Sequence, residues 1–170
     1  ASMSVAAGYG ERMLAVTSSH FGSAEKEFRF PLGYANQRPL SAHWTVTGSG
    51  AFIVGKNRSR VRITGVTVGK IVDYGLKDSQ NMGACMAPAA CDTIIQNLED
   101  FERKETDYDR IITGDLGYVG QSILFDLMRG KEHDIKINHM DCGMTIFDQN
   151  LQDTHAGGSG CGCAAATLSA

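Results

Sequence analysis

The chain has 170 residues, of which 42% are hydrophobic and 21% charged, and its formal net charge at pH 7 is −3. These values are ordinary for a globular protein with one core. No basic run points to nucleic acid, and no apolar stretch approaches the ~18 residues that a membrane-spanning helix needs. No secretory signal is visible. We therefore expect an intracellular globular domain that does not bind nucleic acid.

The cysteines favour neither a disulfide framework nor a zinc site, because their number is odd and no C-x-x-C pair occurs. We expect free thiols in a reducing compartment, with no metal and no cofactor. The five are Cys85, Cys91, Cys142, Cys161 and Cys163.

The first half of the chain reads mainly as strands. Small residues over 2–9 indicate the back half of a helix, and "RMLAVTSS" (12–19) has the short apolar pattern of a buried strand. The connection 20–42 is long and aromatic, which is typical of a functional loop or a dimer contact. Residues 43–56 alternate as one strand, kinked near its glycines, and the β-branched run 59–72 indicates another strand.

The second half alternates between strands and helices. Residues 81–104 repeat apolar side chains at helical spacing, with Pro88 expected in the first turn. A strand, a helix, a short strand or irregular segment, and a glycine-rich turn that opens a helix follow over 108–115, 117–133, 136–148 and 154–170. This order predicts an α/β fold with some parallel pairing. The uncapped first and last helices suggest a fragment without either flank.

Two polar groups lie close to the end of the first strand. His20 directly follows Ser18 and Ser19, and Arg29 lies between two phenylalanines. Together they could form a wall that holds a small anion, with the guanidinium as a planar fork. The alternative is an ion pair between Arg29 and Glu25 on a helix, with the aromatic rings in the core.

The stretch "AGGSGCGCAAA" (156–166) is the most distinctive. Backbone N–H groups of Gly157, Gly158 and Ser159, at the start of a helix, could bind an anion. The alternative is that the small residues let a helix pack closely on its neighbour. Cys161 and Cys163 could be nucleophiles, although their alternation favours packing.

Three further polar residues have both a functional and a structural interpretation. Asp115 follows the strand 108–115, where open α/β sheets bind ligands, or it caps the next helix. His155 could be a general base, but it lacks an orienting partner, which favours a surface or capping role. His43 could stack a ring together with the tryptophan that follows it, or form part of a half-buried strand.

Several motifs, in order, resemble the stage V sporulation protein AD family. They are "AVTSSHFGSAEKEFRFP", "TVTGSGAFIV", "MAPAACDTI", "IITGDLGYVG" and "AGGSGCGCAAA". The resemblance runs across essentially all 170 residues, but it covers only the middle of the family's length.

The resemblance implies a thiolase-like fold with layered α-β-α-β-α architecture, incomplete at both ends. Residues 1–56 would close the first half and 57–170 would begin the second. Condensing enzymes carry their nucleophilic cysteine at the start of the helix whose tail would be 1–9, outside this chain. Positions 114–117 and 156–159 lack the catalytic His and Asn motifs of those enzymes. We therefore expect no catalysis.

The family also suggests a ligand, dipicolinic acid (pyridine-2,6-dicarboxylate) or its calcium chelate, taken up into the developing spore. The residues expected to bind it are Ser18, Ser19, His20, Arg29, Asp115, Gly157, Gly158 and Ser159. We also expect a homodimer formed through 45–54, and attachment to the spore inner membrane through other uptake proteins. The alternatives are an acyltransferase of the condensing-enzyme type, with its nucleophile outside this chain, and a scaffold for a membrane channel.

Overall fold

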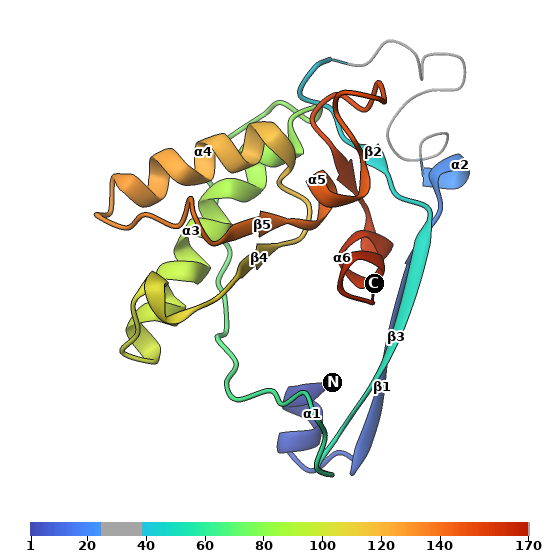
Figure 1. Cartoon of the computed structure of the whole chain (residues 1–170), viewed down its shortest axis with the longest axis vertical. Coiled ribbons are helices and arrows are strands. Elements are labelled where there is room, and N and C mark those ends of the chain that lie inside the picture. Colours follow the sequence, from blue (N-terminus) through green and yellow to red (C-terminus); the bar gives the residue numbers. More distant parts are fainter. Residues whose placement is uncertain (25–38, 170) are drawn as a thin grey trace.

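The computed structural model describes residues 1–24 and 39–169, which form a mixed α/β structure (Figure 1). The helices are α1 (Ser2–Ala6), α2 (Phe21–Ala24), α3 (Met82–Asp100), α4 (Gly117–Arg129), α5 (Cys142–Ile146) and α6 (Cys161–Ser169), with a 3₁₀ turn η2 (Glu105–Asp107). The strands are β1 (Arg12–Ser19), β2 (Trp44–Thr45), β3 (Gly48–Gly55), β4 (Ile111–Thr113), β5 (His139–Asp141) and β6 (Gly158–Ser159). The α/β class predicted from the sequence is confirmed.

Within the described ranges the strands form three two-stranded sheets. β1 and β3 are antiparallel, in a register that runs from Arg12 opposite Gly55 to Ser19 opposite Gly48. β2 pairs with β6, and β4 with β5, both in parallel. The predicted parallel pairing is therefore present, and the strand expected over 43–56 is divided into β2 and β3.

Helices α3 and α4 pack against each other around the larger hydrophobic core. Figure 1 shows them on the side of the molecule away from the β1–β3 ribbon, with α6 between. The buried residues of this core are Ala87, Cys91, Leu116, Leu124, Met128 and Ile135. A smaller core joins α5 and α6 to the residue after β2; its buried members are Val46, Cys142 and Cys163. The predicted helices over 81–104 and 117–133 are confirmed, because their apolar positions repeat at helical spacing and face one another.

Helix α3 begins at Met82, six residues before Pro88, whereas the sequence predicted that Pro88 lies in the first turn. Asn81 caps the helix, and its side-chain oxygen accepts a hydrogen bond from the Ala84 N–H at 3.1 Å. Pro88 therefore lies inside the helix and not in its first turn, so that prediction was wrong. The asparagine decides the start because its oxygen satisfies an N–H that has no partner within the helix.

Strand β1 is not the fully buried strand that its apolar sequence indicated. Its residues alternate between exposed and half-buried, and Leu14 and Val16 are 65% and 64% exposed. The reason is that, among the described elements, α6 covers one face of the ribbon and the face with Leu14 and Val16 is left open. A strand buried on both faces needs a layer on each side of the sheet.

The predicted strand over 59–72 does not form. Residues 65–70 of this segment run alongside α3 instead. The Asn97 amide donates a hydrogen bond to Thr67 Oγ1 at 2.7 Å, and Lys70 forms an ion pair with Asp92 at 2.8 Å. Its β-branched residues favour extended backbone, but a strand also needs a hydrogen-bonded neighbour. No described strand lies in register beside it.

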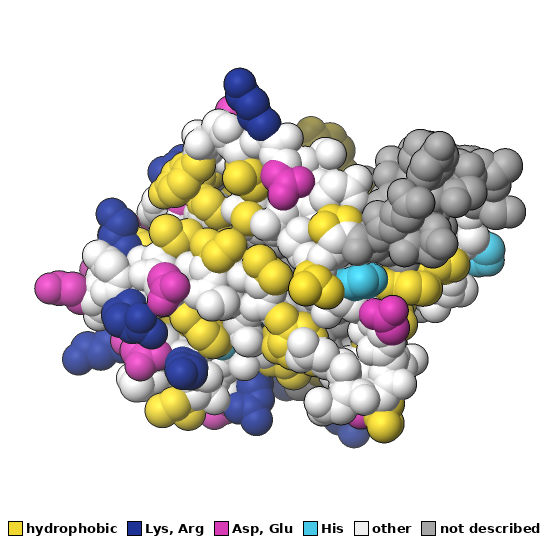
Figure 2. All heavy atoms as spheres, turned by 90° about the horizontal axis from the view of Figure 1, so that it is seen from above, with side chains coloured by type: hydrophobic (Ala, Val, Ile, Leu, Met, Phe, Trp, Pro, Cys, Tyr) yellow, Lys and Arg dark blue, Asp and Glu magenta, His cyan; other side chains and the backbone are white. Residues whose placement is uncertain are grey.

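The surface in Figure 2 carries most of its charged side chains over the α3–α4 part, with Lys and Arg interspersed among Asp and Glu. Uncharged and hydrophobic side chains predominate toward the middle of this face. In the part of the chain that the structure describes, no helix has the length and apolar character needed to cross a bilayer.

The α3–α4 contact provides the first prediction. A Cβ on Gly83 would lie 2.5 Å from the Leu116 carbonyl oxygen and 2.8 Å from the Gly120 nitrogen. We expect Gly83→Ala to lower the free energy of unfolding by about 1–3 kcal/mol, because backbone atoms cannot move aside as a side chain can. Urea denaturation measures this. The control is Gly130→Ala, whose Cβ would meet only atoms at 3.4 Å or more; equal losses in both variants would contradict the prediction.

Candidate functional site

A polar hollow of about 740 Å³ opens where the end of β1, the start of β3 and the start of α6 meet. Hydroxyl-bearing side chains predominate in its wall, and it contains one imidazole. The lining residues are Ser18, Ser19, His20, Ser23, Thr45, Thr47, Gly48, Ser49, Gly160 and Cys161. A volume of this size is typical of small-molecule sites, which span roughly 300–1,000 Å³.

Ser19 connects β1 to α6 through hydrogen bonds in the wall of this hollow. Its hydroxyl donates to the Val46 carbonyl oxygen at 2.6 Å and accepts from the Gly162 N–H at 3.0 Å. Alternation along β1 puts Ser19 on the face toward α6. Ser18 lies on the opposite face, where it pairs with Ser49 across the ribbon and is exposed. Ser19 therefore holds the wall together, while Ser18 keeps its hydroxyl accessible.

His20 is exposed at the rim, and its orientation depends on the short helix α2. The Ser23 N–H and the Ser23 hydroxyl both lie 3.4 Å from His20 Nδ1. With Nδ1 as the acceptor, a neutral ring carries its proton on Nε2. Helix α2 is itself held in place, since the Phe21 ring stacks on Trp44 with centroids 4.9 Å apart. The geometry thus makes His20 Nε2–H a donor at the edge of the hollow.

The backbone of the glycine-rich turn is largely committed to the fold. Gly158 and Ser159 form β6, where the Gly157 and Ser159 carbonyl oxygens accept from Trp44 and Val46 of the β2 segment. The Gly160 N–H donates to Asp115 Oδ2 at 3.2 Å. The Gly157 N–H donates to a carbonyl oxygen, and the Gly162 N–H to Ser19. The backbone of this turn therefore offers few free donors to the hollow.

Asp115 accepts a hydrogen bond from the glycine-rich turn but does not cap α4. The first N–H groups of that helix, from Leu116 and Gly117, donate to Asp141 at 2.9 and 3.0 Å. Asp141 is only 2% exposed, and it also accepts from the Thr113 hydroxyl at 2.6 Å. No sequence motif identified Asp141 as a site residue. Its position at the end of a predicted short strand is the only signal that could have suggested it.

His139 extends this hydrogen-bond network on the far side of Thr113. The Gln121 amide nitrogen lies 3.0 Å from His139 Nδ1, and Thr113 Oγ1 lies 3.0 Å from Nε2. Because the amide nitrogen is a donor, Nδ1 accepts and Nε2 donates. Burial lowers the pKa of His139 below its usual value. The network therefore contains a neutral imidazole at neutral pH.

The buried thiols are poor nucleophiles. Burial raises the pKa of Cys142, and burial together with the neighbouring Asp115 carboxylate raises the pKa of Cys163 well above the ordinary thiol value. Since the thiolate is the reactive form, both remain neutral at physiological pH. Cys161 is exposed in the hollow, and its carbonyl oxygen accepts a hydrogen bond from the Thr17 hydroxyl.

The structure brings several of the predicted site residues together. Ser18, Ser19 and His20 line the hollow. Asp115 is linked to it through Gly160, and the turn 157–159 lies directly before that glycine. Arg29 and its aromatic neighbours lie outside the described residues. Lining residues that the sequence analysis did not identify are Ser23, Thr45, Thr47 and Ser49.

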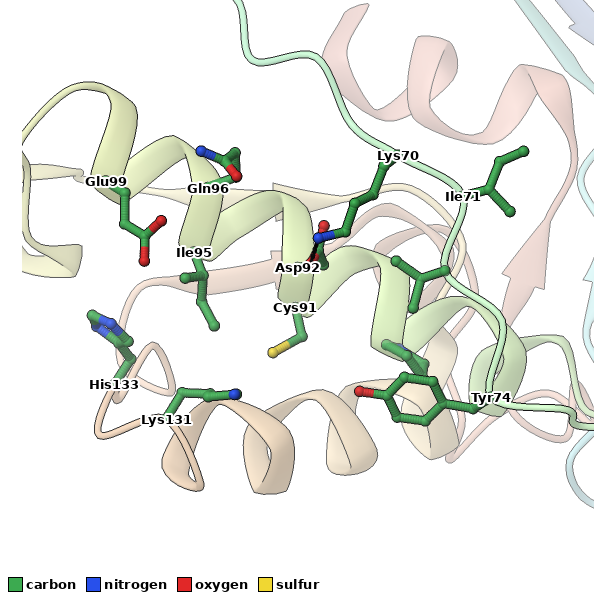
Figure 3. Close-up of a pocket in the computed structure, with 12 residues that line it drawn as sticks. Lys70, Ile71, Tyr74, Cys91, Asp92, Ile95, Gln96, Glu99, Lys131 and His133 are labelled. Carbon is green, nitrogen blue, oxygen red and sulfur yellow. Dashed lines mark ion pairs between the residues drawn. The ribbon is translucent and has the colours of Figure 1, made fainter.

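A second hollow of about 540 Å³ lies between segment 70–74, α3 and the connection after α4 (Figure 3). Its walls combine opposite charges, including the Lys70–Asp92 pair, above an apolar floor that includes Cys91 and Ile95. His133, at its far end, lies 3.2 Å from Glu105. None of the predicted site residues line this hollow.

The described residues thus define an α/β chain with a hydroxyl-lined hollow at the end of a strand. The sequence model of Stage V sporulation protein AD matches residues 1–170. The chain is 46% identical over 165 residues to Stage V sporulation protein AD of Bacillus subtilis (strain 168). That alignment covers 97% of this chain and 48% of the relative, so the chain spans about half the relative's length.

The chain belongs to the stage V sporulation protein AD family, and its role lies in sporulation. The family predicted from the sequence motifs is therefore confirmed.

The buried carboxylate at the start of α4 provides the second prediction. We expect Asp141→Asn to lower the free energy of unfolding by about 1–3 kcal/mol, because the amide presents an NH₂ group where the carboxylate accepted hydrogen bonds. Thermal or urea unfolding measures the change. Asp126→Asn is the control, because Asp126 forms only an exposed ion pair with Arg129. The role given to Asp141 is wrong if the two variants are equally stable.

The neutral His139 ring provides the third prediction. Its pKa is lowered in the folded state, so the unfolded chain binds more protons below the ordinary imidazole value of about 6.5. The stability contributed by the neutral ring is complete above that value and is lost as the pH falls below it. We expect the urea midpoint of His139→Gln to decline less between pH 7.5 and 5.5 than that of the unmodified chain. Equal declines would show that His139 does not titrate in this way.

Proposed function

We propose that the chain contributes a non-catalytic binding site for dipicolinic acid, carried as its calcium chelate, during uptake into the developing spore. The observation that supports this most is the hollow at the end of β1, lined by Ser18, His20 and further hydroxyl groups. The proposal also follows from the resemblance of the sequence to the family.

The chemistry of the lining matches a ligand rich in oxygen acceptors. Dipicolinate carries two carboxylates on a planar ring, and a carboxylate accepts hydrogen bonds from hydroxyl and imidazole donors. Ser18 and His20 Nε2–H offer such donors at the rim of the hollow. Ser23 and Ser49 extend the set of hydroxyls around the same space.

The charge of the lining favours the chelate over the free dianion. No Lys or Arg is among the described residues that line the hollow. A bare dianion there would leave water without a compensating charge, which is costly. The one-to-one calcium chelate is neutral overall and does not carry this cost. Calcium would thus enter with the ligand, as part of it.

The residues at the two family motifs support binding over catalysis. Where condensing enzymes carry catalytic side chains, this chain has Asp115 hydrogen-bonded to a backbone N–H and a turn built into β6. Claisen chemistry requires groups that stabilise a thioester oxyanion and move protons. The neutral thiols Cys142 and Cys163 do not offer a nucleophile in this region.

We extend the proposal to assembly as a homodimer. Strand β3 pairs on one edge with β1, and no other described strand occupies its second edge. An unpaired edge is suited to strand addition across a two-fold axis. Sedimentation velocity of the full-length protein should give twice the monomer mass, and a monomer at micromolar concentration would contradict this extension.

Calorimetry of the full-length protein tests the ligand site. We expect calcium dipicolinate to bind, and His20→Ala together with Ser18→Ala to weaken it roughly tenfold or more, since each lost hydrogen bond to a charged group contributes about 1.5–3 kcal/mol. His133→Ala, in the second hollow, is the matched control and should bind normally. Unchanged affinity in the double variant would place the ligand elsewhere.

A parallel incubation with acyl-CoA separates the proposal from the acyltransferase alternative. We expect neither a covalent acyl adduct nor release of CoA. Either product would show that the protein is an enzyme and would overturn the non-catalytic part of the proposal.

A further inference from the structure

A cluster of cations lies at the end of the β1–β3 ribbon that is remote from the polar hollow. Four of the seven residues in "KNRSRVR" (56–62) are Lys or Arg, a short basic run that the composition and charge of the whole chain did not reveal, and a fifth cation begins β1. All are exposed. We call this cluster the basic tip; its members are Arg12, Lys56, Arg58, Arg60 and Arg62.

The strand register brings the two parts of the basic tip together. Arg12 lies opposite Gly55, the last residue of β3. The next residue, Lys56, donates its N–H to the Glu11 carbonyl oxygen at 3.4 Å. Helix α1 packs against both strands at this end, which is the lower end of the molecule in Figure 1. Arg12 and Lys56, from two distant parts of the sequence, thus lie side by side, and Arg58, Arg60 and Arg62 follow Lys56 in the connection that leads away from the ribbon.

The positive charge of the basic tip is not neutralised locally. Within 9–12 and 55–63 the one acidic residue is Glu11. Across residues 1–24 and 39–169, no ion pair involves a member of the basic tip. By contrast, acidic and basic side chains are interspersed over the face in Figure 2. A single-sign cluster of this kind attracts anions over about a Debye length, ~10 Å at 0.1 M salt.

Exposed apolar side chains are interleaved with these cations. Val61 is 82% exposed and Ile63 59% exposed, and both lie in the same segment as Arg60 and Arg62. Tyr9, just before β1, is 82% exposed. A free polyanion provides no place for aliphatic side chains, whereas the boundary between lipid headgroups and acyl chains accommodates both classes.

We propose that the basic tip docks directly on an anionic lipid bilayer. The cations contact acidic headgroups, and Tyr9, Val61 and Ile63 enter the boundary region. This goes beyond the proposed ligand binding and does not depend on it. The hollow lies at the Ser19–Gly48 end of the ribbon, seven residues along β1 from the Arg12–Gly55 end. At ~3.3 Å per residue the two ends are roughly 23 Å apart, so a docked protein leaves the hollow open.

Co-sedimentation of the full-length protein with vesicles tests the proposal. The vesicles contain 30% phosphatidylglycerol in phosphatidylcholine, or phosphatidylcholine alone. We expect binding to the first only, and weaker binding when salt is raised from 0.05 to 0.3 M. Arg58→Gln with Arg60→Gln and Arg62→Gln should reduce the partition coefficient roughly 100-fold.

The matched control removes the same charge from other exposed positions, as Lys77→Gln with Lys131→Gln and Lys136→Gln. We expect this triple variant to bind nearly as the unmodified protein does. An equal loss in both triple variants would show that only net charge matters, and absence of binding to the anionic vesicles would overturn the proposal outright. Circular dichroism confirms that each variant is folded.

A second comparison separates a bilayer from a soluble polyanion. Val61→Ser with Ile63→Ser should weaken vesicle binding at 0.3 M salt severalfold while leaving retention on immobilised heparin unchanged. If the double variant binds vesicles as tightly as the unmodified protein, the apolar side chains do not enter lipid. The basic tip would then recognise polyanions in general, and the bilayer proposal would be wrong.

Discussion

Helix α6 lies against the β1–β3 ribbon at a distance that only glycine permits, and the polar hollow depends on this contact. A Cβ on Gly162 would lie 2.1 Å from the Gly48 carbonyl oxygen, and one on Gly50 would lie 2.6 Å from the Ala165 Cβ. The close approach lets the Ser19 hydroxyl reach the Gly162 N–H. It therefore brings the start of α6 beside the strand end where His20 lies. The small residues of the turn and of α6 allow the helix to pack closely on the ribbon. This close packing in turn forms one wall of the hollow.

The hydrogen bonds around this contact determine what kind of ligand the hollow suits. N–H groups of the glycine-rich turn donate to Ser19, to Asp115 and to a carbonyl oxygen, so they support the fold. The polar side chains that line the hollow are hydroxyls and an imidazole. Such a lining suits a ligand with many acceptor oxygens and little net charge, because no described cation lines it. This is the physical reason for preferring a chelated dicarboxylate over a free one.

The β1–β3 ribbon also separates two surfaces of different character. At one end lie the serines and His20; at the other lie the cations of the basic tip with exposed aliphatic neighbours. Both strands of the ribbon are paired throughout their length, so its two ends are separate surfaces joined by one sheet. Attachment to a surface through one end would therefore hold the hollow away from that surface and open to incoming ligand. If both proposals hold, the protein receives its ligand on the side away from the bilayer.

The sequence by itself determined β1, α3, α4 and the turn before α6, because strand composition, helical spacing and glycine act within short segments. The sequence also determined the family, because short motifs of that family occur in the same order along the chain. The thiolase-like arrangement stays a prediction. Only the tertiary structure decided that 59–72 forms no strand and that residues 65–70 lie along α3, since a strand requires a hydrogen-bonded neighbour. It also decided that Asp141 anchors α4 and that Ser23 and Ser49 share a hollow with His20. Those relations join residues far apart in the chain, and local pattern does not encode which distant backbone will lie within hydrogen-bonding reach.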